Sequence, residues 1–196
     1  MKKILVTVLV LCVFTSGYSQ KEGKFRVGLD LGYTFASNGG GILMSIEPKY
    51  NIKDNMNVGL RIGGAAMVRD IETNGSTQNA KVSINSSYVG TYDYYFDKSG
   101  KSFVPYIGGG AGYYSIANVA FDNGTSNQVV ALDASGKMGG LLRGGFEWAK
   151  FRMGLEYNLV PKSTLQDING NSLGTISNSY LGLHLGFYVG GGKWRD

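Results

Sequence analysis

The feature that most limits what this chain can fold into is a period-two alternation of apolar and polar residues. In the segment 24–36, for example, Val27 and Leu29 alternate with Gly28 and Asp30. A strand places successive side chains on opposite faces, so this pattern predicts strands whose two faces meet different surroundings. The predicted strands are 24–36, 42–52, 56–69, 81–96, 103–119, 137–148, 151–160 and 179–190. The fifth is the least regular, because consecutive glycines interrupt it.

The connections between these segments alternate in length. The short ones are 53–55, 98–102 and 149–150, and the long ones are 70–80, 121–135 and 161–178. The long connections are rich in Asn, Gly, Ser, Thr and Asp, as loops are, although the first outer connection, 37–41, is short. Short turns at one end and longer loops at the other are typical of bacterial transmembrane barrels. The sequence therefore predicts an all-β fold, an eight-stranded antiparallel up-and-down transmembrane β-barrel that follows an N-terminal signal peptide.

The beginning of the chain has the features of an export signal. Two lysines precede an uncharged apolar run at 4–14, which is too short for a membrane-spanning helix of about 20 residues. The small residues Gly17 and Ser19 fit positions −3 and −1 of a cleavage site. We therefore expect a signal peptide at 1–19 and a single outer-membrane β-barrel domain at 20–196.

Cysteine usage and charge exclude several classes of function. The only cysteine, Cys12, lies in the leader, so the mature chain has no thiol for disulfides or for nucleophilic catalysis. The large residues at 9–11 argue against a lipid anchor on Cys12. Without the two lysines of the leader the net charge falls from +5 to +3, which is mild, and the basic residues are scattered, so no nucleic-acid partner is expected.

The alternation alone does not distinguish a membrane barrel from a soluble exported lipocalin-like carrier, which would point its apolar face inward. The aromatic residues favour the membrane barrel, because many share the aliphatic face and fall at one end of their strands, as an interfacial girdle does. The predicted girdle consists of Phe25, Tyr50, Tyr94, Phe96, Phe103, Phe146, Trp148, Phe151 and Phe187. Tyr33 and Phe35 fall at the opposite end.

With this architecture, and with the glycine- and tyrosine-rich phrase at 105–114, the chain resembles the small outer-membrane β-barrels. These include OmpX-like barrels, OmpA-type barrel domains and porin-family proteins of Bacteroidota. The resemblance covers about 20–190 and implies a fold more than an activity. Such barrels often end in an aromatic residue on the last strand. Phe187 fits that place, but a glycine-rich charged tail follows it.

The polar face predicts a barrel interior that carries charge. Its members are Arg26, Asp30, Glu47, Lys49, Arg61, Asp93, Lys137, Arg143, Glu147, Arg152, Glu156 and His184. Paired charges such as Arg143 with Glu147, and Arg152 with Glu156, suit a narrow interior that side chains fill. The same charges could line a narrow porin-like channel for ions or small solutes.

His184 is the only histidine, and it raises one catalytic hypothesis. Some small outer-membrane barrels are lipid A-modifying enzymes that use a histidine with a serine, but no such signature is legible in this chain. A histidine that is hydrogen-bonded within the interior is favoured instead. With no second histidine and no cysteine in the mature chain, we expect no metal site, no cofactor and no enzyme.

These observations combine into one functional hypothesis, a monomeric barrel of the cell outer membrane with its termini in the periplasm. The expected role is structural or surface-interaction, with the loops 70–80, 121–135 and 161–178 as the binding surface. The expected partners are outer-membrane lipids, lipopolysaccharide and, during biogenesis, the outer-membrane assembly machinery. The narrow channel, the lipid A-modifying enzyme and the soluble carrier remain the alternatives.

Overall fold

The computed structural model describes residues 22–36, 39–73, 76–96, 103–121, 129–166 and 172–191. The predicted signal peptide therefore lies outside the described residues. The strands are β1 (Phe25–Ala36), β2 (Gly39–Lys53), β3 (Met56–Thr73), β4 (Ser76–Tyr95), β5 (Phe103–Phe121), β6 (Val129–Trp148), β7 (Phe151–Leu159), β8 (Ser163–Gln166), β9 (Ser172–Ile176) and β10 (Tyr180–Gly190). No helix among the described residues is long and apolar enough to cross a membrane.

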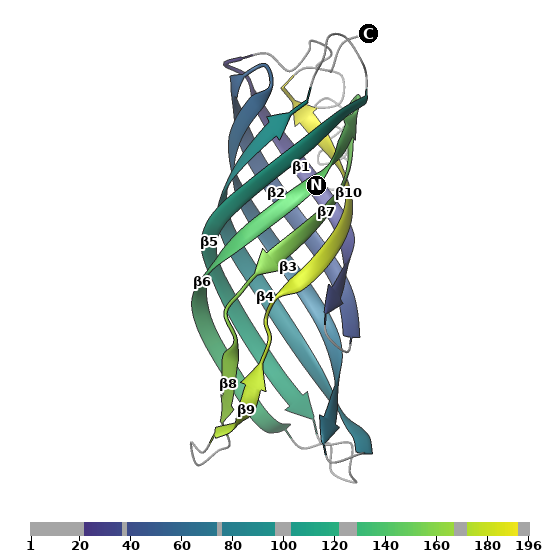
Figure 1. Cartoon of the computed structure of the whole chain (residues 1–196), viewed down its shortest axis with the longest axis vertical. Helices are drawn as coiled ribbons and strands as arrows, with labels where there is room; N and C mark the ends of the chain where they lie inside the picture. The colour runs from purple at the N-terminus through teal and green to yellow at the C-terminus, as the bar shows by residue number, and fades with distance from the viewer. Residues whose placement is uncertain are drawn as a thin grey trace, which may run out of the picture.

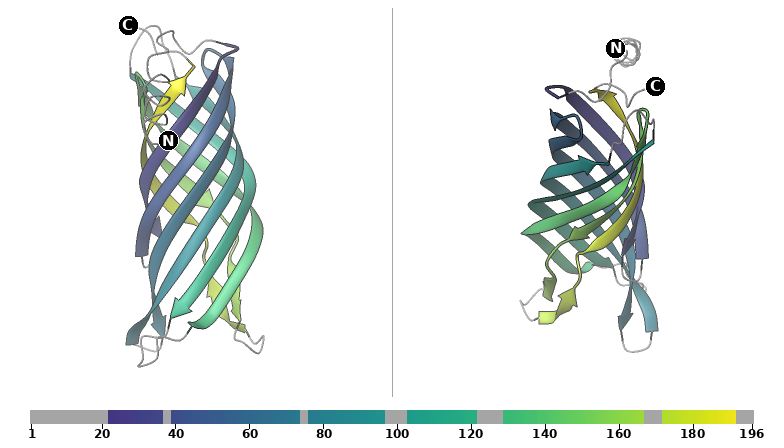
Figure 2. Two further views of the ribbon diagram at one scale, coloured as in Figure 1. Left: turned by 180° about the vertical axis from the view of Figure 1, so that it is seen from behind. Right: turned by 45° about the horizontal axis from the view of Figure 1, so that its top comes forward.

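Eight of these strands close into one barrel, in the order β1-β10-β7-β6-β5-β4-β3-β2 (Figure 1). Every neighbouring pair is antiparallel. Figure 2 shows the strands winding at a common tilt around the barrel axis. The predicted eight-stranded up-and-down barrel is thus confirmed, and β5 crosses its glycines without a break.

The two ends of the barrel differ in which strands are joined there. At the turn end, uppermost in Figure 1, β2 is joined to β3, β4 to β5 and β6 to β7. At the hairpin end, β1 is joined to β2, β3 to β4 and β5 to β6. Residues 54–55 alone separate β2 from β3, and 149–150 separate β6 from β7, as the short predicted turns require.

The prediction that 70–80 and 121–135 are loops is wrong for most of their length. β3 and β4 stay paired as far as Thr73 and Ser76, and β5 stays paired with β6 as far as Val129. Beyond the bilayer both faces of a strand meet water, so the alternation disappears although the backbone ladder continues. These segments therefore have the composition of a loop although their backbone is still a strand.

The predicted loop 161–178 is also partly wrong, because it contains the two-stranded sheet β8-β9. This hairpin continues the β7–β10 ribbon past Pro161, which has no backbone N–H for the ladder. A side chain bridges the break: Asn178 Nδ2 donates to the Pro161 carbonyl oxygen at 2.6 Å and to Ser163 Oγ at 2.9 Å. Figure 1 shows β8 and β9 projecting at the hairpin end.

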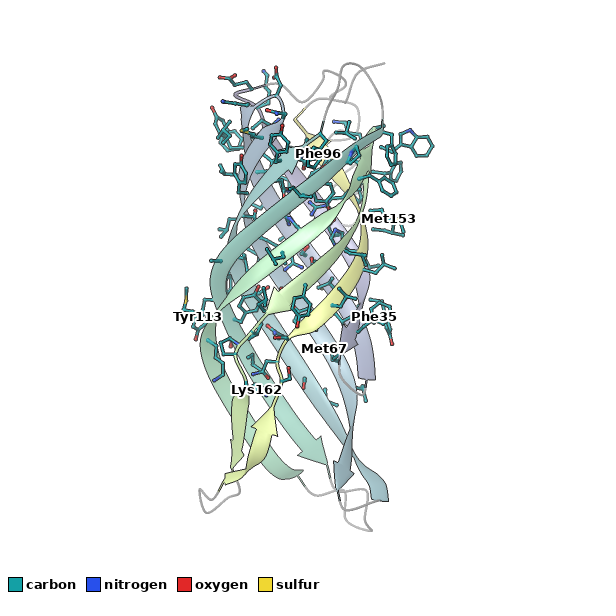
Figure 3. The ribbon with its side chains drawn as sticks, viewed as in Figure 1. Phe35, Met67, Phe96, Tyr113, Met153 and Lys162 are labelled. Atoms are coloured by element: carbon teal, nitrogen blue, oxygen red, sulfur yellow. The ribbon has the colours of Figure 1, made fainter. Side chains whose placement is uncertain are left out.

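The two faces of the barrel wall have opposite chemistry. Aliphatic and aromatic side chains cover the outside, where Leu31 is 61% exposed and Leu185 is 60% exposed. Charged side chains of the same strands are buried inside. Figure 3 shows Tyr113 and Phe35 on the outside of the wall and Met67 within it. A soluble lipocalin-like carrier would have the reverse arrangement, so that alternative is wrong.

Candidate functional site

The barrel interior brings together nearly all the charged residues that the alternation placed on the polar face. Of the predicted interior charges, those that are at most 8% exposed are Arg26, Asp30, Glu47, Lys49, Arg61, Asp93, Arg143, Glu147, Arg152, Glu156 and His184. Lys137 differs from them, because it lies towards the hairpin end and is only half-buried. Apart from the single histidine, this buried set has as many cations as carboxylates, so the charges compensate one another.

At the turn end of the interior, Arg26 lies between a carboxylate and aromatic rings. Arg26 donates through Nη1 to Glu147 Oε2 at 2.9 Å and through Nη2 to Glu147 Oε1 at 3.1 Å. Tyr95 donates to the same carboxylate at 2.7 Å and also contacts Arg26. The guanidinium carbon of Arg26 lies 3.9 Å from the centroid of the Tyr188 ring, a cation–π contact.

The middle of the interior contains the densest cluster, which Arg143 organises. Its guanidinium donates to both oxygens of Glu47, at 2.6 and 3.0 Å, and to both oxygens of Asp93, at 2.8 and 2.9 Å. Lys49 pairs with the same two carboxylates, at 3.2 Å from Glu47. Arg152 lies 3.4 Å from Glu47. Multiple charge-assisted bonds to each ion are what make a buried ionic cluster tolerable.

A second cluster, nearer the hairpin end, contains His184. Arg61 Nη2 donates to both oxygens of Glu156, at 2.8 and 3.0 Å, and Asn158 donates to Oε1 at 2.8 Å. His184 Nδ1 lies 3.4 Å from Glu156 Oε2, and its Nε2 lies 3.5 Å from the Tyr106 hydroxyl. The histidine is therefore placed between a carboxylate that already has an arginine and a buried phenol.

Among the described contacts, His184 is not paired with a serine. The neighbours of His184 are an acid and a phenol, as described above. The hydroxyl of Ser45 donates instead to Asp30, at 3.2 Å. Among the described residues, no group of three or more His, Cys, Asp and Glu side chains is placed to hold a metal ion.

The predicted pairings within a strand, Arg143 with Glu147 and Arg152 with Glu156, are wrong. Residues four apart on a strand are separated by about 13 Å, which is far for an ion pair. The partners come from across the interior: Glu147 binds Arg26, and Glu156 binds Arg61. These pairs join strands that are not neighbours in the wall.

Inward-facing glycines provide the space that these side chains occupy. A Cβ at Gly154 would lie 2.4 Å from the Tyr106 hydroxyl and 2.8 Å from His184 Nε2. A Cβ at Gly186 would lie 2.1 Å from Asp30 Oδ1. The high glycine content of the strands follows in part from this need, because an eight-stranded barrel is only just wide enough for side chains.

Towards the hairpin end the interior also contains buried apolar clusters, beside polar residues such as Asn85, and the alternation did not predict these clusters. One buried cluster contains Val89, Tyr114, Ile116, Leu141 and Val160. A second contains Leu43, Ala65, Met67 and Tyr180. The signal was present in the sequence, because Leu43 falls on the polar face of its strand. The expected interior of polar side chains is therefore correct for the charged part and incomplete for this end.

The predicted girdle residues lie at the turn end of their strands, on the outside of the barrel or half-buried beside it. Ring pairs connect several of them, with centroids 4.9 Å apart for Phe25 and Tyr50 and 4.6 Å apart for Phe103 and Phe146. Further aromatic residues lie on the same face nearer the hairpin end, namely Tyr33, Phe35, Tyr88, Tyr113 and Tyr157. On β1, the eight residue steps from Phe25 to Tyr33 span about 20 Å along the barrel axis at a tilt of about 40°.

A closed antiparallel barrel with an apolar exterior, a charged interior and aromatic residues at two levels is the architecture of an integral outer-membrane β-barrel protein. The structure is similar to the outer membrane protein OprG from Pseudomonas aeruginosa, with a TM-score of 0.56 and 11% identity over 87% of this chain and 99% of that chain. It is also similar to a major outer membrane protein from Thermus thermophilus, with a TM-score of 0.52 and 12% identity over 84% of this chain and 99% of that chain.

At these identities the likeness shows the fold, which is that of the small outer-membrane barrels. No protein-family model matches the chain, and no curated protein sequence matches it. The role of the barrel must therefore be argued from its own residues.

Proposed function

We propose that the protein is a surface-interaction protein, in which a closed barrel anchors a sheet that projects beyond the membrane and binds an extended polypeptide. The observation that carries this proposal is a free strand edge on β6. β7 pairs with β6 only from Gly140 towards the turn end. Within the described part of the chain, β6 residues 129–139 pair with β5 on one side, except at a register shift beside Val130, and have no ladder partner on the other.

A free edge of this length is a binding feature in its own right. The eleven residues of 129–139 correspond to about 36 Å of strand, which displays a row of backbone donors and acceptors. Extended peptides add to such edges through main-chain hydrogen bonds. β8 lies beside part of this edge, but its ladder is with β9, so the β6 backbone groups there are not paired with it. The binding surface is therefore backbone as well as loop.

The interior supports an anchor in preference to a channel. Its ionic groups are buried, most of them are paired across the barrel, and apolar clusters follow them towards the hairpin end. In planar bilayers we expect folded protein to give no discrete conductance steps. Steps that change in size when Glu47 is replaced by Gln would overturn the closed-barrel proposal and favour the narrow porin-like channel.

The remaining parts of the proposal concern the membrane environment. The aromatic residues at the turn end would form the periplasmic interfacial girdle, and outer-membrane lipids would surround the apolar band. The barrel would be monomeric, with lipopolysaccharide on the outer side and the assembly machinery as a partner during biogenesis. Its interior groups would stabilise the fold and would perform no catalysis.

A peptide-binding experiment tests the proposed edge. The probe is a labelled synthetic peptide with the sequence of residues 111–121 from β5, the native antiparallel partner of β6, and its control is a scrambled peptide. Successive N–H groups of a strand point to opposite edges, so proline is placed separately at Ala134 and at Ser135. We expect fluorescence anisotropy to show binding that proline at the free-edge position abolishes. Equal binding of both peptides, or binding that neither proline changes, would refute the edge.

A further inference from the structure

The outer wall carries two parallel rows of side chains that cross the same six neighbouring strands, from β6 through β7, β10, β1 and β2 to β3. The strand register defines the rows, because each member lies directly opposite the next. The first row is Trp148, Phe151, Phe187, Leu29, Ile46 and Ile62. The second row is Phe146, Met153, Leu185, Leu31, Met44 and Gly64.

A groove lies between these rows. A hollow of about 570 Å³ covers the part from β10 to β3, and a second of about 400 Å³ covers the part from β6 to β10. The two meet at Leu185, Gly186 and Phe187, which line both. Every member of both rows lines one hollow or the other. The floor of the groove is formed by residues of the row between them, such as Gly63 and Gly186. These are inward-facing positions, where a Cβ would meet side chains of the interior.

The course of the groove can be worked out from barrel geometry. Six strands about 4.8 Å apart give a length of about 24 Å. The strands tilt by about 40°, so a line perpendicular to them lies about 50° from the barrel axis. The groove therefore extends about 15 Å along the barrel axis, from the turn end towards the hairpin end. It begins at the turn end beside Trp148, where β6 ends, and reaches Gly64, which is eight residues along β3 from Met56. A rise of about 15 Å is the depth of one leaflet of a hydrocarbon core about 30 Å thick.

We propose that this groove is a binding site for one acyl chain of a phospholipid of the periplasmic leaflet. The groove lies in the apolar band, starts among the aromatic residues of the turn end and rises through one leaflet. The cationic Lys150 is on the turn between Trp148 and Phe151 and donates to the Gly190 carbonyl oxygen at 2.9 Å. Its positive charge at the mouth of the groove complements the phosphate of a phospholipid headgroup.

Gly64 strengthens the case, because the barrel itself does not require a glycine there. A Cβ at Gly64 would meet its nearest atoms, Met44 Cγ and the Asn85 carbonyl oxygen, at 3.9 and 4.0 Å, which is ordinary contact. Inward glycines such as Gly186 are different, because a Cβ there would meet an atom at 2.1 Å. The missing side chain at Gly64 instead leaves the far end of the groove open.

The test fills the groove and compares the result with equal filling elsewhere on the outer wall. The variant Gly64→Phe/Leu185→Phe adds bulk at the far end and at the junction of the two hollows. The control Gly90→Phe/Leu142→Phe adds the same groups outside the groove: Leu142 is 58% exposed, against 60% for Leu185. A Cβ at Gly90 would meet its nearest atom at 3.8 Å. Heat-dependent migration on a gel confirms that each variant is folded.

Native mass spectrometry of protein extracted from palmitoyl-oleoyl phosphatidylglycerol vesicles then measures the lipid that stays bound. We expect one retained phospholipid in the wild type and the control. We expect at least a tenfold weaker retention in the filled variant, a change that corresponds to about 1.4 kcal/mol. Equal retention by the two variants, or no retained lipid in the wild type, would overturn the site.

A second measurement gives the depth and the source of the chain. In a Trp194→Phe background, bromine atoms near the headgroup end of the acyl chain should quench Trp148 more than bromine atoms near its methyl end. The opposite order would place the headgroup at the wrong end of the groove and refute a periplasmic-leaflet lipid. Retention of lipopolysaccharide in place of phosphatidylglycerol, when both are supplied, would refute it as well.

Discussion

Replacement of Arg143 by Met is the most informative single perturbation of the interior. Arg143 donates four hydrogen bonds to Glu47 and Asp93, both of which are 0% exposed. Met has a similar apolar volume but supplies no charge, so the central cluster would keep both carboxylates with Lys49 and Arg152 as their cations. Removing one partner from a buried ion pair costs about 3–5 kcal/mol, because the other charge stays desolvated. We expect the free energy of unfolding to fall by that amount.

The assay is urea unfolding of the protein in phospholipid vesicles, followed by tryptophan fluorescence and approached from both the folded and the unfolded side. Lys53→Met is the control, since it removes one positive charge from an exposed position and should change the free energy by less than about 0.5 kcal/mol. The double variant Arg143→Met/Glu47→Gln restores the charge balance. It should therefore be less destabilised than the sum of the two single changes.

Two results would refute this reasoning. An Arg143→Met protein that loses no more stability than the Lys53→Met control would mean that water reaches the cluster and screens it. Strict additivity in the double variant would mean that Arg143 and Glu47 do not interact, contrary to their 2.6 Å contact. Either outcome would reopen the channel hypothesis, since a hydrated interior is what conduction needs.

Three further predictions follow from individual contacts. Gly154→Ala should destabilise the barrel by about 1–3 kcal/mol, whereas Gly140→Ala should not, since a Cβ there meets its nearest atom at 3.7 Å; chemical unfolding compares the two. Tyr188→Phe removes the hydroxyl that accepts from Lys49 and Arg152, and the same assay should show a loss of about 1.5–3 kcal/mol. Asn178→Ala should speed hydrogen exchange in β8 and β9 without a change in global stability; unchanged exchange would refute its bridging role.

The sequence predicted the part of the fold in which the two faces of each strand meet different surroundings. Within the membrane-spanning wall, the lipid and the narrow interior impose opposite requirements on the two faces of a strand, so alternation reveals each strand. That signal ends where the strands leave the membrane, because water then lies on both sides, although β3 continues to Thr73 and β6 begins at Val129. The break at Pro161 was also hidden, since a proline near the end of a strand reads as the start of a loop.

The alternation of faces identified most of the residues that point inward, but not which of them contact one another. Arg26 and Glu147 are 121 positions apart, and Arg61 and Glu156 are 95 positions apart. Their contacts depend on how the barrel closes and on the stagger between strands, which no local pattern encodes. Apolar inward residues such as Leu43 were overlooked for a different reason. The prediction assumed that every inward-facing residue is polar, and these residues are not.

The paired charges give the interior a role in specifying the register of the barrel. A shift of one residue in any strand would turn its inward side chains towards lipid. For Arg61 or Arg143 that exposure would cost about 2–4 kcal/mol near the middle of the bilayer, and it would also leave a carboxylate unpaired inside. Arg143 of β6 meets Glu47 of β2, and Arg61 of β3 meets Glu156 of β7. Because these pairs join strands on different sides of the barrel, they form only when all eight strands are closed in the native register.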